Sequence, residues 1–378
     1  MNGATAPGQD EPLLTPGTYS DVISSGERRS YRVRLDATSN AYVSAVLVPP
    51  PGAATAPGDG VRVALRDSGG FTCSSRNSIT LGSGAPGPVA DYSTRRIERG
   101  RQCQRAGEYQ YTVEWLGSTR RTTAIDWRVE LRYMVEPGLR GDAPVPSATP
   151  SLPEHDPEHL RGTPKATRGG TGFNDAPALG RGLWRDALAP GETRFYRVPL
   201  EWGQQLFLDA ESGAARVPDG TRLTLFNTAR GFVEDVRADG TDRSAGLRLG
   251  TVPTAFANRS LQQDDHTAMR FSGWYYVRLS LGPEAGRPLP VTLRVDIEGK
   301  PVKGPAYDGD PVAAGFGLSD EERLAVPRGG GEGVGGSGGR GTLLTVVGYS
   351  GVGLGTVLTL GLAVWTLSSR RRTGRHAS

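Results

Sequence analysis

The chain repeats itself at an interval of about 165 residues. Residues 17–35 align with residues 182–200 without a gap, and both segments end in Tyr-Arg-Val-x-Leu. Two later pairs follow in the same order, Gly58–Val63 with Pro218–Leu223 and Gly107–Tyr109 with Gly273–Tyr275. Solenoid repeats have shorter periods, so this interval predicts a duplication of a whole domain.

Both copies are patterned as β-strands with one buried face. Tyr31, Val33 and Leu35 alternate with Arg32 and Arg34, a period of two that is typical of a strand. We expect short strands, Asp-Gly and Ser-Gly turns, and antiparallel sheets packed as sandwiches. The same alternation recurs at Val61–Arg66, Tyr109–Trp115, Trp127–Tyr133, Tyr275–Leu281 and Val291–Ile297.

One stretch near the C-terminus is long and uncharged enough to cross a membrane. Thr342–Leu367 holds about 26 residues without a charge, and as a helix this stretch exceeds the ~30 Å hydrocarbon core of a bilayer. The arginines at 370–372 and 375 follow it, and positive charge is retained on the cytoplasmic side. We therefore expect a single-pass protein of the cell membrane with its N-terminal bulk outside and its tail in the cytoplasm. Residues 1–7 do not resemble a signal peptide, so we expect a processed chain or an upstream start.

The remaining composition limits the class of protein. The formal net charge is +4, and the four tail arginines account for it, so the charge does not indicate nucleic-acid binding. Lys and Arg together number 44, of which only Lys165, Lys300 and Lys303 are Lys. This skew indicates a GC-rich genome, and we expect a high-GC Gram-positive bacterium.

We predict seven segments along the chain. The Pro-rich segment between the two copies is irregular, so we expect each copy to fold alone without a large shared interface. The segments are a disordered N-terminal segment (1–15), β-sandwich domain 1 (16–137), a Pro-rich linker (138–175), β-sandwich domain 2 (176–299), an irregular Gly-rich stalk (300–341), a transmembrane helix (342–367) and a basic cytoplasmic tail (368–378).

Cys73 and Cys103 are the two cysteines of the sequence. A cysteine pair in an oxidising compartment most often forms a disulfide, which here closes a loop of about 30 residues. A reactive thiol or a metal pair is the alternative, but no histidine precedes His155. We predict the disulfide.

The opening unit of each copy resembles the bacterial pre-peptidase C-terminal domain. It reads Gly-x-Tyr/Trp-x-Asp-x-[Ile/Leu]-x-x-Gly-Glu-x-x-x-Tyr-Arg-Val-x-Leu, and a later Gly-x-Tyr leads into a long alternating strand. The resemblance implies jelly-roll sandwiches like those appended to secreted peptidases, some of which are implicated in binding calcium, collagen or polysaccharide. The fold expected is therefore all-β, with two antiparallel jelly-roll-like β-sandwich domains plus one C-terminal transmembrane α-helix. The acid-rich stretch of that family is not evident, and no peptidase domain accompanies the copies.

Motifs that could support catalysis or bind a metal are better explained by turns and linkers. Ser337 lies in a Gly-x-Ser-x-Gly string, but glycine-rich sequence surrounds it where a nucleophile needs a strand and a helix. His155 and His159 could attract zinc, yet Pro153 and Pro157 disfavour the helix that would align them. The acids of Gln263–His266, with Asp59 and Asp219, could bind calcium or serve turns. We predict no catalytic residues, no metal and no cofactor.

Three groups of residues are candidates for binding. Five arginines near Cys103 could face an anionic partner, although Asp91, Glu98 and Glu108 dilute their charge and a solvated loop is the alternative. Aromatic residues could form a sugar platform, but we expect them in the cores. Small residues at every fourth position of the membrane segment could let helices pair. These groups are Arg95, Arg96, Arg99, Arg101 and Arg105; Tyr19, Tyr109, Trp115 and Trp184; and Gly351, Gly355, Thr359 and Ala363.

These observations predict a membrane-anchored extracytoplasmic binding or assembly protein without catalytic activity. The alternative is an accessory subunit that presents substrate to a partner hydrolase or peptidase. We expect the membrane and either another membrane protein or an envelope polymer as partners, and no nucleic acid.

Overall fold

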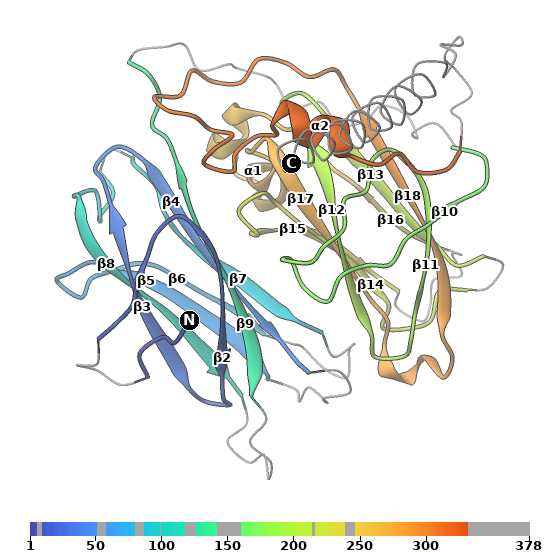
Figure 1. Ribbon diagram of the computed structural model, residues 1–378, viewed down its shortest axis with the longest axis horizontal. Helices are drawn as coiled ribbons and strands as arrows, with labels where there is room; N and C mark the ends of the chain where they lie inside the picture. The colour runs from blue at the N-terminus through green and yellow to red at the C-terminus, as the bar shows by residue number, and fades with distance from the viewer. Residues whose placement is uncertain are drawn as a thin grey trace, which may run out of the picture. The chain divides into compact units, whose positions relative to one another are not determined.

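The computed structural model describes residues 1–5, 10–50, 58–79, 87–98, 100–117, 126–141, 160–213, 216–238 and 246–331, drawn in colour in Figure 1. Residues Met1–Gly333 belong to one compact unit. Strands dominate its secondary structure, which confirms the prediction of an all-β fold for the described part of the chain. Its few helices are short: η1 (Phe256–Ser260), α1 (Asp264–Ala268), η2 (Pro283–Ala285) and α2 (Asp320–Ala325).

The first copy folds into two facing sheets. One has the strand order β2-β9-β4-β7 and the other β3-β8-β5-β6, with β1 added in parallel to β3. The alternating residues Tyr31, Val33 and Leu35 point into the core, while Arg32 and Arg34 are exposed. The strands are β1 (Leu13–Leu14), β2 (Gly17–Ile23), β3 (Arg28–Leu35), β4 (Asn40–Val48), β5 (Gly60–Arg66), β6 (Thr72–Ile79), β7 (Val89–Arg95), β8 (Gly107–Leu116) and β9 (Trp127–Glu136).

The second copy has the same arrangement of eight strands, but its short parallel strand is added to the other sheet. Its sheets have the orders β11-β18-β13-β16 and β12-β17-β14-β15, with β10 added in parallel to β11. Eight strands in these two orders make a jelly roll in each copy. The strands are β10 (Lys165–Ala166), β11 (Gly182–Leu188), β12 (Thr193–Leu200), β13 (Gln205–Glu211), β14 (Arg222–Phe226), β15 (Phe232–Arg237), β16 (Gly246–Gly250), β17 (Gly273–Ser280) and β18 (Leu289–Glu298).

Aligned residues of the two copies form equivalent hydrogen bonds. The Tyr31 hydroxyl donates to the buried Asp21 carboxylate at 2.7 Å, and the Tyr196 hydroxyl donates to Asp186 at the same distance. Two further aligned pairs each donate to the carbonyl four residues earlier. They are Tyr19 to Thr15 (2.6 Å) with Trp184 to Gly180 (2.9 Å), and Tyr109 to Arg105 (2.6 Å) with Tyr275 to Phe271 (2.8 Å).

The segment that leads into each copy is held against its sandwich. The backbone N–H of Gly3 donates to Asp21 at 2.7 Å, and that of Gly169 donates to Asp186 at 2.8 Å. A Cβ on Gly3 would lie 2.6 Å from the Tyr31 ring, so only glycine permits this approach. The described residues of 1–15 therefore differ from the disordered segment that we predicted, because backbone pairing and the buried Leu14 hold them.

The two sandwiches stack with one sheet of each facing the other (Figure 1). The outer face of β2-β9-β4-β7 contributes Val46 and Val48 to an apolar cluster, and β12-β17-β14-β15 contributes Phe195, Trp274 and Tyr276. β4 is consequently buried at eight of its nine positions. This interface differs from the small interface that we predicted, because apolar side chains of the two facing sheets pack against one another. A second cluster joins them through Tyr42, Tyr92, Met134, Ala229, Phe271 and Phe316.

A buried carboxylate lies where the sandwiches meet. Glu136, at the end of β9, accepts hydrogen bonds from Asn40 (2.8 Å), Tyr42 (2.9 Å), Arg259 (2.9 Å) and Tyr307 (2.8 Å). Burial alone would raise the pKa of Glu136, but the charge of Arg259 and these hydrogen bonds outweigh it and lower the pKa. This one side chain thus connects the first sandwich, the second sandwich and the segment after β18.

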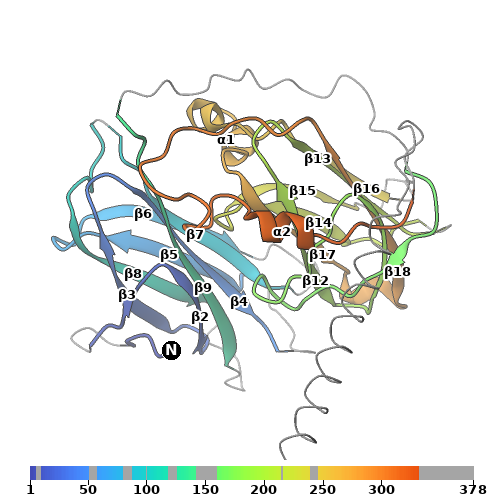
Figure 2. The same ribbon diagram turned by 45° about the horizontal axis from the view of Figure 1, so that its top comes forward.

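The segment after β18 crosses both sandwiches (Figure 2). Arg140 donates to the carbonyl of Ala306 at 2.8 Å, and Trp274 donates to Glu322 of α2 at 2.9 Å. Phe316 and Leu318 are buried. Residues 301–331 therefore differ from the predicted stalk, since these buried side chains anchor them. No helix among the described residues is long and apolar enough to span a membrane, and the predicted span Thr342–Leu367 lies outside them.

Candidate anion-binding site

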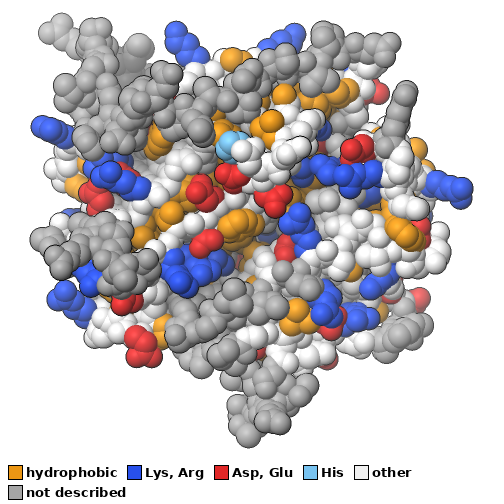
Figure 3. Space-filling model, turned by 180° about the vertical axis from the view of Figure 1, so that it is seen from behind, with side chains coloured by type: hydrophobic (Ala, Val, Ile, Leu, Met, Phe, Trp, Pro, Cys, Tyr) orange, Lys and Arg blue, Asp and Glu red, His pale blue; other side chains and the backbone are white. Residues whose placement is uncertain are grey.

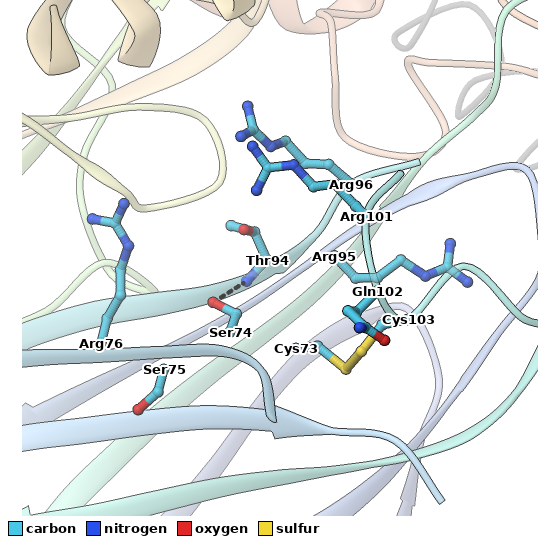
Figure 4. A pocket seen from close by; sticks show the side chains of 10 residues that line it. All are labelled: Cys73, Ser74, Ser75, Arg76, Thr94, Arg95, Arg96, Arg101, Gln102 and Cys103. Carbon is cyan, nitrogen blue, oxygen red and sulfur yellow. Dashed lines mark hydrogen bonds between the residues drawn. A yellow bond between two sulfur atoms is a disulfide. The ribbon is translucent and has the colours of Figure 1, made fainter. Parts of the chain in front are cut away.

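A pocket of about 240 Å³ lies at one edge of the first sandwich (Figure 4). It forms where β6 and β7, the edge strands of the two sheets, approach each other beside the loop that leads to β8. The backbone N–H of Thr94 on β7 donates to the Ser74 hydroxyl on β6 at 3.2 Å. The pocket is lined by Cys73, Ser74, Ser75, Arg76, Thr94, Arg95, Arg96, Arg101, Gln102 and Cys103.

The predicted disulfide between Cys73 and Cys103 is confirmed, with an S–S distance of 2.02 Å. It links β6 to the loop between β7 and β8. Cys103 has a φ of +64°, a left-handed conformation that is uncommon for a residue with a side chain. The Tyr109 hydroxyl donates to the Cys103 carbonyl at 3.1 Å, which helps to hold this turn.

The side chain of Gln104 holds the backbone of the loop between β7 and β8. The Gln104 side chain accepts from the Glu98 N–H at 2.9 Å and donates to the Arg96 carbonyl at 3.0 Å. Ile97 N–H donates to the Asn40 side chain on β4 at 2.8 Å. These bonds fix the backbone that carries Arg96 and Arg101, so both arginines project from an ordered base.

Three arginines supply the positive charge of the pocket. Figure 4 shows Arg96 and Arg101 side by side above the disulfide, with Arg76 rising from β6. Arg101 forms an ion pair of 2.6 Å with Glu98, and both side chains are exposed. Burial lowers the pKa of the Arg96 guanidinium, and the nearby charges of Arg270 and Arg101 lower it further. An anion bound here would relieve that repulsion.

The predicted five-arginine patch is only partly brought together. Arg95, Arg96 and Arg101 line the pocket, but Arg95 is 2% exposed, donates to the carbonyls of Ser39 and Asp36, and lies 5.8 Å from the centre of the Tyr109 ring. Arg95 therefore supports the fold of the pocket wall. Arg105 is exposed but does not line the pocket, and Arg99 lies outside the described residues.

Arg76 is the pocket residue that the sequence pattern missed. It lies about 20 residues upstream of the arginine-rich segment, and its guanidinium stands 5.6 Å from the ring centre of Tyr92. Only the approach of β6 to β7 brings it to the site. The cysteine pair was the available signal, because Cys73 lies three residues before Arg76.

The other candidate residues do not form a site in the described part of the chain. Trp115, Trp184 and Tyr109 are buried and Tyr19 packs against the core, which confirms their assignment to the cores. The described residues hold no group of three or more acids, histidines or cysteines that could bind a metal ion. The remaining predicted residues lie outside them, namely His155, His159, Gly351, Gly355, Thr359 and Ala363.

Charge elsewhere on the surface is more evenly mixed. Figure 3 shows Lys and Arg side chains interspersed with acidic and apolar ones over the face opposite to the view of Figure 1. On the sheet β3-β8-β5-β6, Arg32 and Arg34 pair with Glu108 at 3.1 and 2.7 Å. By contrast, the ten residues that line the pocket include no Asp or Glu.

Comparisons with known proteins leave the family open. No family model matches the chain, and no curated protein matches it. Among solved structures, tripeptidyl peptidase 2 is 8% identical over 75% of this chain with a TM-score of 0.23, and the chain spans only 24% of its length. The tandem CBM22 domain of Xyn10C from Paenibacillus barcinonensis is 12% identical (79% of this chain, 94% of that one, TM-score 0.21). An uncharacterized protein from Burkholderia cenocepacia is 10% identical (74% and 82%, TM-score 0.22). At such scores these likenesses carry no argument.

Proposed function

We propose that this chain is a membrane-anchored extracytoplasmic binding protein without catalytic activity, and that its pocket binds anionic groups of an envelope polymer. The observation that carries the proposal is the convergence of Arg76, Arg96 and Arg101 on a pocket with no lining carboxylate. Guanidinium groups present fixed N–H donors that match phosphate and carboxylate oxygens.

The construction of the pocket favours a specific contact over a diffuse one. Arg76 comes from a sheet edge, and Arg96 and Arg101 come from a loop whose backbone is held by Gln104. The hydroxyl of Thr94 adds a neutral donor at the same pocket. A volume of about 240 Å³ accommodates one charged group with part of its sugar or glycerol, so a polymer would bind through one repeating unit at a time.

The proposed location rests on two observations. The disulfide fits an oxidising compartment outside the cytoplasm. The uncharged segment Thr342–Leu367 with its arginine tail supports one membrane span with the sandwiches outside. The jelly-roll strand order is compatible with two pre-peptidase C-terminal-like domains, which we propose as the family of both copies.

Binding of the full-length chain in nonionic detergent to inorganic polyphosphate and to polygalacturonate tests this proposal. Arg76→Ala and Arg101→Ala should each weaken binding of the preferred polymer about tenfold, since one charge-assisted hydrogen bond contributes roughly 1.5 kcal/mol. Arg34→Ala is the matched control, because Arg34 is exposed, pairs with Glu108, and lies on β3, which β8 and β5 separate from the pocket strand β6. Equal losses in all three variants, or no binding of either polymer, would refute the pocket as the ligand site.

A further inference from the structure

The disulfide forms part of the wall of the anion pocket. Both Cys73 and Cys103 line it, and Cys73 is only partly buried. Cys103 also belongs to the hydrophobic core of the first sandwich, and Cys73 packs against that core. The disulfide therefore lies between the core and the pocket.

The disulfide also joins the two halves of the pocket. Arg76 and the serine hydroxyls lie on β6, whereas Arg96, Arg101 and Gln102 lie on the loop. The hydrogen bonds seen for described loop residues run within the loop, to Asn40 on β4 or to Tyr109 on β8. Among the described residues, the S–S bond is the link between this loop and β6. Cleavage would remove the covalent tie between the loop that carries Arg101 and the strand that carries Arg76, while the contact between β7 and β6, where Thr94 donates to Ser74, would remain.

The surroundings of the bond favour its attack by a thiolate. Arginines near a sulfur stabilise the thiolate form, and a thiol of lower pKa leaves faster in thiol–disulfide exchange. The cationic pocket also attracts the anionic attacking thiolate. Cys73 is the more accessible of the two sulfur atoms, since Cys103 is 9% exposed.

We propose that the Cys73–Cys103 disulfide is a redox switch that assembles the anion pocket when oxidised and disassembles it when reduced. This inference rests on the proposed function, because it regulates the same site. The reductant is a dithiol. One thiolate attacks the Cys73 sulfur and releases the Cys103 thiolate, and the second thiolate of the dithiol then releases Cys73. The dithiol becomes a disulfide, its two electrons pass to the cysteines, and its two protons are available to the new thiolates.

Binding and redox state must then influence each other equally. If reduction weakens anion binding, a bound anion must make reduction less favourable by the same factor. An occupied pocket also covers the sulfur atoms and repels an incoming thiolate. Anion binding should therefore make reduction less favourable at equilibrium and, by covering the sulfur atoms, slower.

The test uses the full-length chain in nonionic detergent, with polyphosphate as the anion and dithiothreitol as the dithiol, at constant ionic strength. We expect the dissociation constant for polyphosphate to rise at least tenfold on reduction. We expect saturating polyphosphate to slow thiol release severalfold. Arg101→Ala should abolish this protection, and Arg34→Ala should retain it.

The outcomes separate the two proposals. If the oxidised chain does not bind polyphosphate or polygalacturonate, the proposed function fails and the switch fails with it. If the chain binds equally well in both redox states, or if saturating anion leaves the reduction rate unchanged, the switch alone is overturned. Circular dichroism of the reduced chain shows whether the sandwich persists. If reduction unfolds the sandwich, the test is the effect of polyphosphate on the rate at which dithiothreitol reduces the folded, oxidised chain.

Discussion

The two copies share one strand order, but they contact each other through different sheets. The first copy uses the outer face of β2-β9-β4-β7, and the second uses the outer face of β12-β17-β14-β15. On β8, Glu108, Gln110 and Glu114 point away from the core toward solvent. The aligned positions on β17 carry Trp274, Tyr276 and Ser280, which are buried against the first sandwich or beside it. The outer face of this sheet is therefore polar in the first copy and largely aromatic in the second.

The other sheet shows the reverse difference. On β4, Tyr42, Ser44 and Val46 are buried beneath the second sandwich, and the aligned positions on β13 carry Phe207, Asp209 and Glu211. Arg294 pairs with Glu211 at 3.0 Å and with Asp209 at 3.6 Å on this outer face.

These differences leave the pair of sandwiches with one buried junction and two solvated outer faces. The contact joins unlike faces, and a contact of that kind can in principle repeat without closing. Each outer face of the pair instead carries ion pairs, much as the terminal repeats of a solenoid carry a polar cap. Different residues at the same aligned positions therefore give each copy one buried outer face and one solvated outer face.

The largest expected effect on stability comes from exchanging the residues at the aligned positions 46 and 211. Val46→Glu places in the first copy the residue that the second copy has at position 211, and Val46 is fully buried. An unpaired buried carboxylate should lower the free energy of unfolding by about 3–5 kcal/mol. The reciprocal Glu211→Val lies on the outer face and should cost about 0.5 kcal/mol. Chemical denaturation of both variants tests the comparison, and similar losses would contradict it.

The next effect concerns the two glutamates that end β9 and β18. Glu136 pairs with Asn40 across the sheet as Glu298 pairs with Gln205, but only Glu136 is buried between the sandwiches. Glu136→Ala leaves Arg259 without its partner and should lower the free energy of unfolding by about 3 kcal/mol. Glu298→Ala should cost about 0.5 kcal/mol. Thermal unfolding of the two variants distinguishes them, and equal shifts in Tm would show that the junction does not depend on Glu136.

A smaller effect separates Tyr276 from Gln110, its counterpart in the first copy. The Tyr276 hydroxyl accepts from Arg132 of the first sandwich at 2.6 Å. Tyr276→Phe should cost roughly 1.5 kcal/mol, because the partly buried Arg132 guanidinium loses this acceptor. Gln110→Ala should cost about 0.5 kcal/mol. A double variant of Arg132 and Tyr276 should show non-additive losses in denaturation, whereas additive losses would mean that the two residues do not interact.

Much of each sandwich could be predicted from the sequence, and the stacking could not. Residues 31–35 alternate because one face meets the core and the other meets water, so period-two patterning found the inner faces. The run Ala41–Val48 is almost continuously apolar, which is typical of a strand covered on both faces. That signal indicates that β4 is covered, but it does not identify the covering partner, because the partner depends on packing between distant segments.

The candidate site could likewise be predicted only in part from the sequence. Composition located the arginine-rich segment and the cysteine pair, because both are local features of the sequence. It could not tell that Arg95, at the end of β7, turns inward while Arg96 turns toward the pocket. It also could not bring Arg76 to them, since that requires edge strands of two different sheets to approach each other.

The smallest expected effect is on the pH dependence of the free energy of unfolding, through Glu136 at the junction of the two sandwiches. The folded-state pKa of Glu136 lies below its usual value of 4.5, so its ionised form stabilises the fold at neutral pH. This contribution is fully present above about pH 4.5 and is lost as the pH falls through the lowered pKa of the folded state. The free energy of unfolding of the native chain should therefore fall more steeply in acid than that of Glu136→Gln. If Glu136→Gln keeps the slope of the native chain between about pH 5 and pH 3, the carboxylate at the junction does not control the acid stability of the stack.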